Sequence, residues 1–204
     1  PPWPELAATP NMAYNGWLAS TSFMGFNNET LYYNIVDQLV KSGLRDAGYS
    51  TIGVTCNGWV RDPLTRKLTL PTTGRRAWPR GFKALVDYAH QHGIKISAYT
   101  DTGKINCCGE PGAFGNEELD VQTFADFGVD HVSVDNCGNG FGSTQSILEY
   151  KRFHDALVKV GHPMVYGIWS VGKGKPWAWA PKLVSQMTNR RRLPSQLSEK
   201  SRCA

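Results

Sequence analysis

The chain has 204 residues, more than a typical domain of about 150 residues and fewer than the roughly 250 of a complete eight-stranded barrel. Apolar residues make up 41% of the chain and charged residues 19%, which excludes a disordered chain, a collagen and a coiled coil. The net charge of +5 comes mostly from residues 188–204, which hold five cations and one anion, so we expect no nucleic-acid partner. No run of about 20 apolar residues predicts a membrane span, and no signal peptide is present at the start of these residues.

A repeated junction of helix, glycine and apolar run organises the chain. The glycines are Gly48, Gly93, Gly128 and Gly161, and the apolar runs that follow them cover 51–54, 94–99, 129–134 and 164–168. Their spacings of 45, 35 and 33 residues match a strand, a helix and the loops between them. Apolar residues recur with helical spacing in the segments before these glycines and in 147–160. With an opening strand in 12–17, the pattern predicts five parallel strands and four helices before it stops near residue 184.

Two α/β architectures fit this order, an open doubly wound sheet and a (β/α) barrel. Both place ligands at the carboxyl ends of the strands. The side chains at those ends are Asn15, Trp17, residues 55–59, Thr100 and Asp101, residues 135–137 and Trp169.

Two carboxylates stand at these strand ends. Asp135 directly follows the buried strand 132–134, where a rigidly held carboxylate can act as nucleophile or base; a carboxylate that caps a loop is the alternative. Asp101 ends the preceding strand, beside Tyr99, whose ring could lie against a sugar. Because paired carboxylates across a pocket cleave glycosides, the pattern favours carbohydrate chemistry.

Two glycine-rich loops and five cysteines offer other chemistry. The loop from Gly138 resembles a phosphate-binding turn, but Ser143 stands where a dinucleotide motif has its third glycine. In residues 167–174, Gly174 replaces the hydroxyl that would bind Mg²⁺ in a P-loop. The cysteines show no paired CxxC spacing, so we expect neither a nucleotide nor a metal ion.

Seven spaced stretches, in this order, resemble the secreted α-galactosidase (melibiase) family, glycoside hydrolase family 27, and within it the fungal members. They are residues 6–17, 42–49, 56–59 with Arg61 and Asp62, 78–85, 99–103, 108–120 and 123–137. The resemblance implies a (β/α)8 barrel, of which residues 1–187 would form about the first five units. Residues 188–204 are unrelated to the family, and we expect this basic tail to be disordered.

The resemblance also implies a function. Asp135 matches the nucleophile that cleaves terminal α-galactosides with retention of configuration, and Trp17 and Tyr99 match aromatic residues that contact the sugar. Asp101, Thr55 and Ser133 stand at further substrate-binding positions. The family uses no metal ion or other cofactor, acts on α-galactoside oligosaccharides or glycoconjugates, and is secreted.

Two covalent features follow from the resemblance and from a sequence motif. Cys108 and Cys137 match a disulfide at the rim of the pocket, which would leave Cys56 free, with Cys107 as the rival for Cys137. Asn28, in the sequon Asn28-Glu29-Thr30, is a glycosylation acceptor if the chain is secreted.

The chain departs from the family at several binding positions. Thr55 stands where the family has a carboxylate that holds sugar hydroxyls, Ser133 replaces a lysine, and Trp169-Ser170 replaces a Cys-Glu pair. The general acid belongs to later strands that these residues do not include. Two hypotheses remain: a truncated α-galactosidase-type hydrolase with impaired activity, and a catalytically silent remnant that binds a sugar or a partner.

Overall fold

The structure is a computed structural model that describes residues 3–18, 27–137, 144–170 and 174–188. Six strands form one parallel sheet in the order β1-β2-β5-β6-β7-β8. Their bounds are Ala13–Asn15, Thr51–Val54, Lys95–Asp101, His131–Asp135, Val165–Trp169 and Gln186–Thr188. A separate antiparallel pair consists of β3 (Val60–Arg61) and β4 (Leu68–Thr69).

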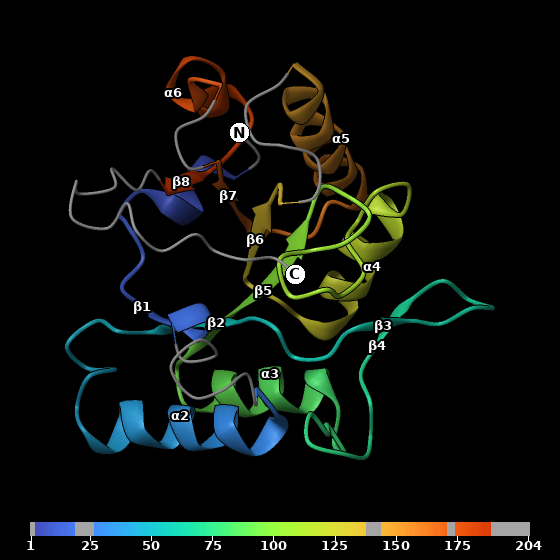
Figure 1. Ribbon diagram of the computed structural model, residues 1–204. Helices are drawn as coiled ribbons and strands as arrows, with labels where there is room; N and C mark the ends of the chain where they lie inside the picture. The colour runs from blue at the N-terminus through green and yellow to red at the C-terminus, as the bar shows by residue number, and fades with distance from the viewer. Residues whose placement is uncertain (1–2, 19–26, 138–143, 171–173, 189–204) are drawn as a thin grey trace, which may run out of the picture.

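Four long helices connect the strands and cover one face of the sheet. They are α2 (Glu29–Lys41), α3 (Phe82–Gln91), α4 (Glu117–Phe127) and α5 (Thr144–Val160). Successive helices pack on one another, and in Figure 1 α2 and α3 lie below the sheet while α4 and α5 lie to its right. The short helices are η1 (Pro4–Ala7), α6 (Pro176–Trp179) and η2 (Ala180–Lys182). A curled parallel sheet with one layer of helices is part of a (β/α)8 barrel, and not a doubly wound sheet with helices on both faces.

The predicted strands are confirmed as parallel and adjacent in sequence order. The five strands expected before residue 184 are all present, and a sixth strand, β8, lies beyond that point and follows β7 in the sheet. Strand β8 has three residues, which is too short to show a periodic pattern in the sequence. The two-residue strands β3 and β4 were not predicted from the sequence for the same reason. None of the helices in the described ranges is long and apolar enough to cross a membrane.

Glycine ends α4 as the repeat predicts. Gly128 has φ +79°, a left-handed conformation that other residues adopt only with strain, and its N–H bonds back to the carbonyl of Ala125 at 2.9 Å. The N–H of Val129 bonds to the carbonyl of Phe124 at 3.0 Å, so the chain leaves the helix and enters the sheet within a few residues.

The two faces of the sheet differ in composition. On the convex face, Ile52 pairs in register with Ile96, and Ala98 with Val132; all four are buried against the helices. On the concave face, small and polar residues align instead, as Gly53 pairs with Ser97. Because side chains alternate along each strand, one row builds the core and the other is left to line a cavity.

Candidate active site

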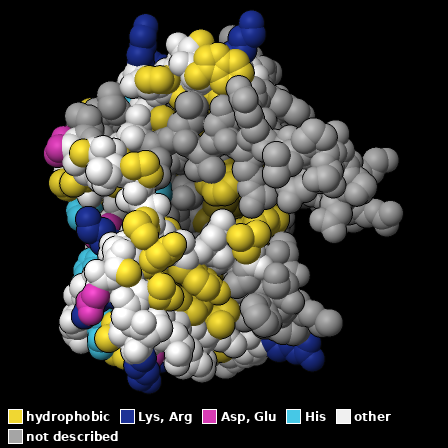
Figure 2. All heavy atoms as spheres, turned by 90° about the vertical axis from the view of Figure 1, so that its left-hand side faces the viewer, with side chains coloured by type: hydrophobic (Ala, Val, Ile, Leu, Met, Phe, Trp, Pro, Cys, Tyr) yellow, Lys and Arg dark blue, Asp and Glu magenta, His cyan; other side chains and the backbone are white. Residues whose placement is uncertain are grey.

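A cavity of about 320 Å³ lies against the concave face of the sheet. Its upper wall is lined by residues at or near the carboxyl ends of strands and by one residue, Cys107, from the loop after β5; the former are Asn15, Trp17, Thr55, Tyr99, Ser133, Asp135 and Trp169. Its lower part is lined by Asn11, Thr51, Ser97 and His131, which lie toward the amino ends of the strands. Figure 2 views the molecule from the left-hand side of Figure 1 and shows hydrophobic side chains around a hollow at mid-height.

Asp135 is the carboxylate of this cavity. Its Oδ2 accepts a hydrogen bond from the hydroxyl of Tyr99 at 3.3 Å, and its Oδ1 accepts one from the backbone N–H of Asn136 at 2.9 Å. Burial raises the pKa of Asp135 to about 7, and the negative charge of Asp101 adds to this rise while the two hydrogen bonds oppose it. Asp135 therefore changes its charge near neutral pH.

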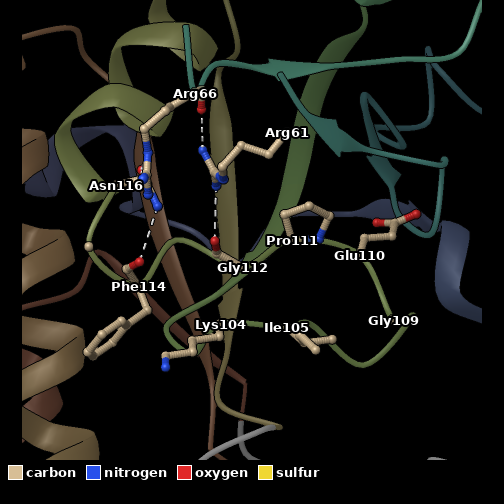
Figure 3. A pocket seen from close by; sticks show the side chains of 11 residues that line it. Arg61, Arg66, Lys104, Ile105, Gly109, Glu110, Pro111, Gly112, Phe114 and Asn116 are labelled. Carbon is tan, nitrogen blue, oxygen red and sulfur yellow. Dashed lines mark hydrogen bonds between the residues drawn. The ribbon is translucent and has the colours of Figure 1, made fainter. Parts of the chain in front are cut away.

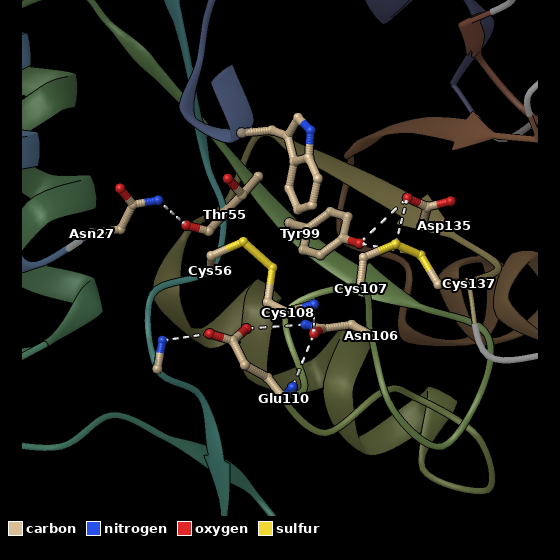
Figure 4. Close-up of a disulfide and its surroundings, with 12 residues drawn as sticks. Asn27, Thr55, Cys56, Tyr99, Asn106, Cys107, Cys108, Glu110, Asp135 and Cys137 are labelled. Carbon is tan, nitrogen blue, oxygen red and sulfur yellow. Dashed lines mark hydrogen bonds between the residues drawn. A yellow bond between two sulfur atoms is a disulfide. The ribbon is translucent and has the colours of Figure 1, made fainter. Parts of the chain in front are cut away.

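Tyr99 lies beside Asp135 and keeps its proton. Burial and the neighbouring carboxylate of Asp135 raise the pKa of Tyr99 far above its ordinary value. In Figure 4 its hydroxyl points toward Asp135 from β5. The phenol is thus a fixed donor to the carboxylate, and its ring forms part of the cavity wall.

The other residues predicted to bind substrate lie at different places in the cavity. Thr55 is 8% exposed and its Oγ1 has no hydrogen-bond partner among the described residues. The Oγ of Ser133 lies 3.3 Å from the Oγ of Ser97, and Trp17 lines the cavity as a half-buried ring. The structure therefore brings Asp135, Tyr99, Thr55, Ser133 and Trp17 together around one cavity.

Asp101 does not line the cavity. Its side chain is fully buried, its Oδ1 accepts the N–H of Gly103 at 2.6 Å and its Oδ2 accepts the N–H of Cys137 at 2.6 Å. A carboxylate without exposed surface cannot touch a bound sugar, so the expected substrate contact is corrected to a role within the protein.

The disulfides differ from the expected pairing. Cys56 is bonded to Cys108 with Cα atoms 5.4 Å apart, and Cys107 to Cys137 with Cα atoms 5.5 Å apart (Figure 4). The prediction of a Cys108 to Cys137 bond with Cys56 free was therefore wrong. The side chain of Asn106 accepts the N–H of Cys108 at 2.8 Å and holds a tight turn in which the adjacent cysteines reach different strand ends. Spacing along the sequence alone cannot show which of two adjacent cysteines bonds to which partner.

Four potential metal ligands lie close together at the cavity. Ligand atoms of Asp101, Cys107, Asp135 and Cys137 lie within 4.8 Å of one another. Two of the four are sulfurs joined in a disulfide, and a metal ion binds thiolates. Both oxygens of Asp101 accept backbone N–H groups, so the cluster does not fit a metal ion.

Two residues at the lower end of the cavity were missed by sequence reasoning. Asn11 Nδ2 lies 3.2 Å from Nδ1 of His131, and burial lowers the pKa of His131 to about 4. The histidine is therefore neutral at physiological pH. The alternation of His131, Ser133 and Asp135 along one strand could have indicated that all three share a face.

A second cavity, of about 560 Å³, lies on the outer side of the loop 104–116 (Figure 3). Arg61 donates to both oxygens of Asp120 at 2.7 and 2.8 Å and to the carbonyl of Gly112 at 3.0 Å. Arg66 donates to Oδ1 of Asn116 at 3.0 and 3.1 Å. Both guanidinium groups fasten the β3–β4 hairpin to the loop and to α4, so their hydrogen bonds are made within the protein.

Asn28 has a structural role at the start of α2. Its Oδ1 accepts the N–H of Leu31 at 3.0 Å as the N-cap, and its Nδ2 donates to the carbonyl of Arg75 at 3.3 Å. The role as N-cap accounts for an asparagine at this position even if it carries no glycan. Glycosylation at Asn28 therefore stays a prediction.

The fold and the cavity define a class of protein. A parallel barrel sheet with a carboxylate at a strand end, beside aromatic rings in a cavity large enough for a sugar, is typical of glycoside hydrolases. Residues 22–197 match the melibiase family described as "Alpha galactosidase A", and the chain belongs to this family.

Related proteins agree with this assignment. The chain is 36% identical over 181 residues to "Alpha-galactosidase A" of Cellvibrio japonicus, covering 86% of this chain and 42% of the relative. It is 34% identical over 177 residues to "Alpha-galactosidase 2" of Arabidopsis thaliana, covering 86% and 43%. Among solved structures, the α-galactosidase MEL1 of Saccharomyces cerevisiae matches with a TM-score of 0.81 at 29% identity, covering 92% of this chain and 41% of that chain. The chain spans less than half the length of these relatives.

Proposed function

We propose that this chain provides the nucleophilic part of a site that cleaves terminal α-galactosides with retention of configuration. The observation that carries the proposal is the carboxylate of Asp135, which lines the cavity and is held by the hydroxyl of Tyr99 at 3.3 Å. In the first step an Asp135 oxygen attacks the anomeric carbon, and the bond to the leaving oxygen breaks with its electron pair. Water then attacks the same carbon, the bond to Asp135 breaks with its electron pair and restores the carboxylate, and the proton that the water loses balances the one taken up by the leaving oxygen.

The rest of the cavity supports a sugar as the ligand. The rings of Trp17, Tyr99 and Trp169 line it and offer apolar faces to the C–H groups of a pyranose. Ser133 offers a hydroxyl, worth about 0.5–1.5 kcal/mol as a neutral hydrogen bond, compared with about 1.5–3 kcal/mol for a charged partner. One relative was solved with raffinose, and we propose α-galactoside oligosaccharides or glycoconjugates as the substrate class for this chain.

We also propose that these 204 residues alone cleave natural α-galactosides only negligibly. Among the described residues that line the cavity, Asp135 is the single carboxylate. A sugar leaving group needs a proton from a second acid, and general acid catalysis contributes about 10²- to 10⁴-fold to the rate. An aryl leaving group that departs as a stable phenolate does not need this proton.

The test compares two substrates on the 204-residue chain. We expect dinitrophenyl α-galactoside to release dinitrophenolate slowly while melibiose stays intact, and Asp135→Asn to abolish the release. Asp62→Asn, which changes a partly exposed carboxylate in the β3–β4 turn, outside the cavity, is the matched control and should leave the release unchanged. Efficient hydrolysis of melibiose, or release that survives Asp135→Asn, contradicts the proposal.

The single carboxylate also favours a second candidate, a silent sugar-binding protein. In that case melibiose shifts the NMR signals of Tyr99 and Trp17 while neither substrate is cleaved. The two functions are thus separated by the release of dinitrophenolate.

We further propose that the chain belongs in a secretory compartment. Its two disulfides, Cys56–Cys108 and Cys107–Cys137, form and persist in oxidising surroundings. Expression through a eukaryotic secretory pathway should give both bonds and a glycan on Asn28, detected as a mass that falls after enzymatic deglycosylation. Free thiols at any of these four cysteines in the secreted protein contradict this proposal.

A further inference from the structure

A cluster of buried polar side chains lies directly after Asp135, outside the residues that line the cavity. Asn136 has no exposed surface; its Oδ1 accepts the hydroxyl of Ser146 at 2.9 Å, and its Nδ2 donates to Oε2 of Glu149 at 2.8 Å and to Oγ1 of Thr102. Thr102 and Glu149 are 1% and 2% exposed. The side chain of Asn136 is therefore held by Thr102, in the loop that follows β5, and by Ser146 and Glu149 on α5.

Backbone contacts hold the neighbours of Asn136 in the same way. The N–H of Thr102 donates to the carbonyl of Asp135 at 2.9 Å, and the buried carboxylate of Asp101 accepts the N–H of Cys137 at 2.6 Å. The N–H of Asn136 itself donates to Oδ1 of Asp135 at 2.9 Å. Three consecutive residues, 135–137, are thus held at the end of β6.

This polar cluster interrupts a face that is otherwise apolar. Val132 and Val134, which precede Asn136 at alternate positions, are fully buried in the hydrophobic core. A buried polar group gains little net stability from its hydrogen bonds, and apolar side chains of similar volume would fill the same space at similar stability. What apolar side chains would not provide is a fixed direction for the end of the strand.

We propose that Asn136 is a positioning residue, which through Glu149, Thr102 and Ser146 fixes the end of β6 so that the carboxylate of Asp135 faces the cavity. This inference rests on the proposed function only in taking Asp135 as the nucleophile. Misplacing a reacting group by about 1 Å can cost about 100-fold in rate, so anchoring of this kind is expected next to a nucleophile.

The test uses two readouts on the 204-residue chain and its variants. The first is an NMR titration of the ¹³C-labelled side-chain carboxyl of Asp135, assigned with Asp135→Asn. The second is the rate of dinitrophenolate release from dinitrophenyl α-galactoside at about pH 9, where the carboxylate is charged in every variant. The titratable groups that face Asp135 are Tyr99 and Asp101 from β5, and Tyr150 and Glu149 lie on α5.

Asn136→Ala is expected to lower the pKa of Asp135 below its value of about 7. Burial is the main cause of that raised pKa, and a loosened strand end admits water to the carboxylate. The release of dinitrophenolate should fall about 10- to 100-fold. Glu149→Gln keeps an acceptor oxygen for Asn136 and should retain both properties of the parent chain.

The control is Thr123→Val, which removes the buried hydrogen bond from Thr123 to the carbonyl of Leu119 within α4, outside the polar cluster around Asn136. It should lower the melting temperature and leave both readouts unchanged. If Asn136→Ala fails to fold, Thr102→Val removes a single contact of Asn136 and should change both readouts in the same direction by less. An Asn136→Ala chain with the parent's pKa and release rate overturns the proposal. A parent chain that releases no dinitrophenolate contradicts the proposed function, while the titration still decides the positioning.

Discussion

The convex and concave faces of the sheet carry different kinds of side chain, apolar on the convex face and small or polar on the concave face. On the convex face Ile52, Ile96 and Val132 are fully buried under helices. On the concave face Ser97 and Ser133 line a cavity of about 320 Å³. The same strands provide both faces, because successive side chains point to opposite sides.

Within each strand, the side chains on the convex face mainly stabilise the fold, and those on the concave face are available for chemistry in the cavity. Apolar side chains on the convex face contribute through buried area, so their volume matters more than their identity. On the concave face the polar side chains that line the cavity, such as Ser133, are those that a ligand can meet. Substitutions on the two faces should therefore have different consequences, and this can be tested at single residues.

The largest effect is expected on the convex side. Phe124 on α4 is fully buried and packs against Trp59, so Phe124→Ala should lower the free energy of unfolding by about 3–5 kcal/mol. Ser97→Ala, on the concave face, removes a 3.3 Å hydrogen bond and should cost about 1 kcal/mol or less. Urea unfolding of both variants measures the difference, and equal losses would contradict the division between the faces.

The next effect is expected at the carboxyl-end rim of the concave face. Replacing both Cys107 and Cys137 by Ala opens a loop that spans 30 residues and should lower the free energy of unfolding by about 3–4 kcal/mol. Peptide mapping without reductant first has to show Cys107 joined to Cys137 and Cys56 joined to Cys108. A link between Cys108 and Cys137 would contradict the pairing on which this prediction depends.

A smaller effect of opposite sign is expected at Asp135. Its pKa is raised to about 7 in the folded chain, so the folded state holds its proton more tightly than the unfolded state does. This contribution to stability is present at low pH and is lost as the pH rises from about 4 to about 7. Asp135→Asn should therefore raise the free energy of unfolding at pH 8 by about 2–3 kcal/mol, and by much less near pH 4.

Thermal unfolding at the two pH values measures this change. Asp62→Asn again serves as the control, since hydrogen bonds from Thr65 lower the pKa of Asp62 and its replacement should not stabilise the chain at pH 8. Stabilisation by Asp135→Asn that is equal at both pH values would show that ionisation of Asp135 is not its cause.

Much of this comparison could be predicted from the sequence. Apolar runs and helix-ending glycines such as Gly128 indicate the parallel strands, and the rule that ligands bind at strand ends singles out Asp135. The strand β8 could not be found, since three residues carry no period. The disulfide pairing depends on how the turn at Asn106 orients two adjacent cysteines, which spacing does not encode.

Side-chain contacts between distant segments also could not be predicted from the sequence. Asn11 lies outside the strands, 120 residues before His131, and only the curled sheet brings them within 3.2 Å. Asp101 and Asp135 end neighbouring strands and look alike in the sequence, yet one faces the cavity and the other binds two backbone N–H groups. Their different roles depend on where the loops turn after each strand.

The most direct test of the central claim is to find where an α-galactoside reacts with the chain. Incubation with dinitrophenyl α-galactoside, followed by acid quenching and peptide mass spectrometry, locates any covalent galactosyl group. We expect a galactosyl ester on Asp135, absent from Asp135→Asn and present in the Asp62→Asn control. A galactosyl group on another residue, or none while dinitrophenolate is released, would show that Asp135 is not the nucleophile.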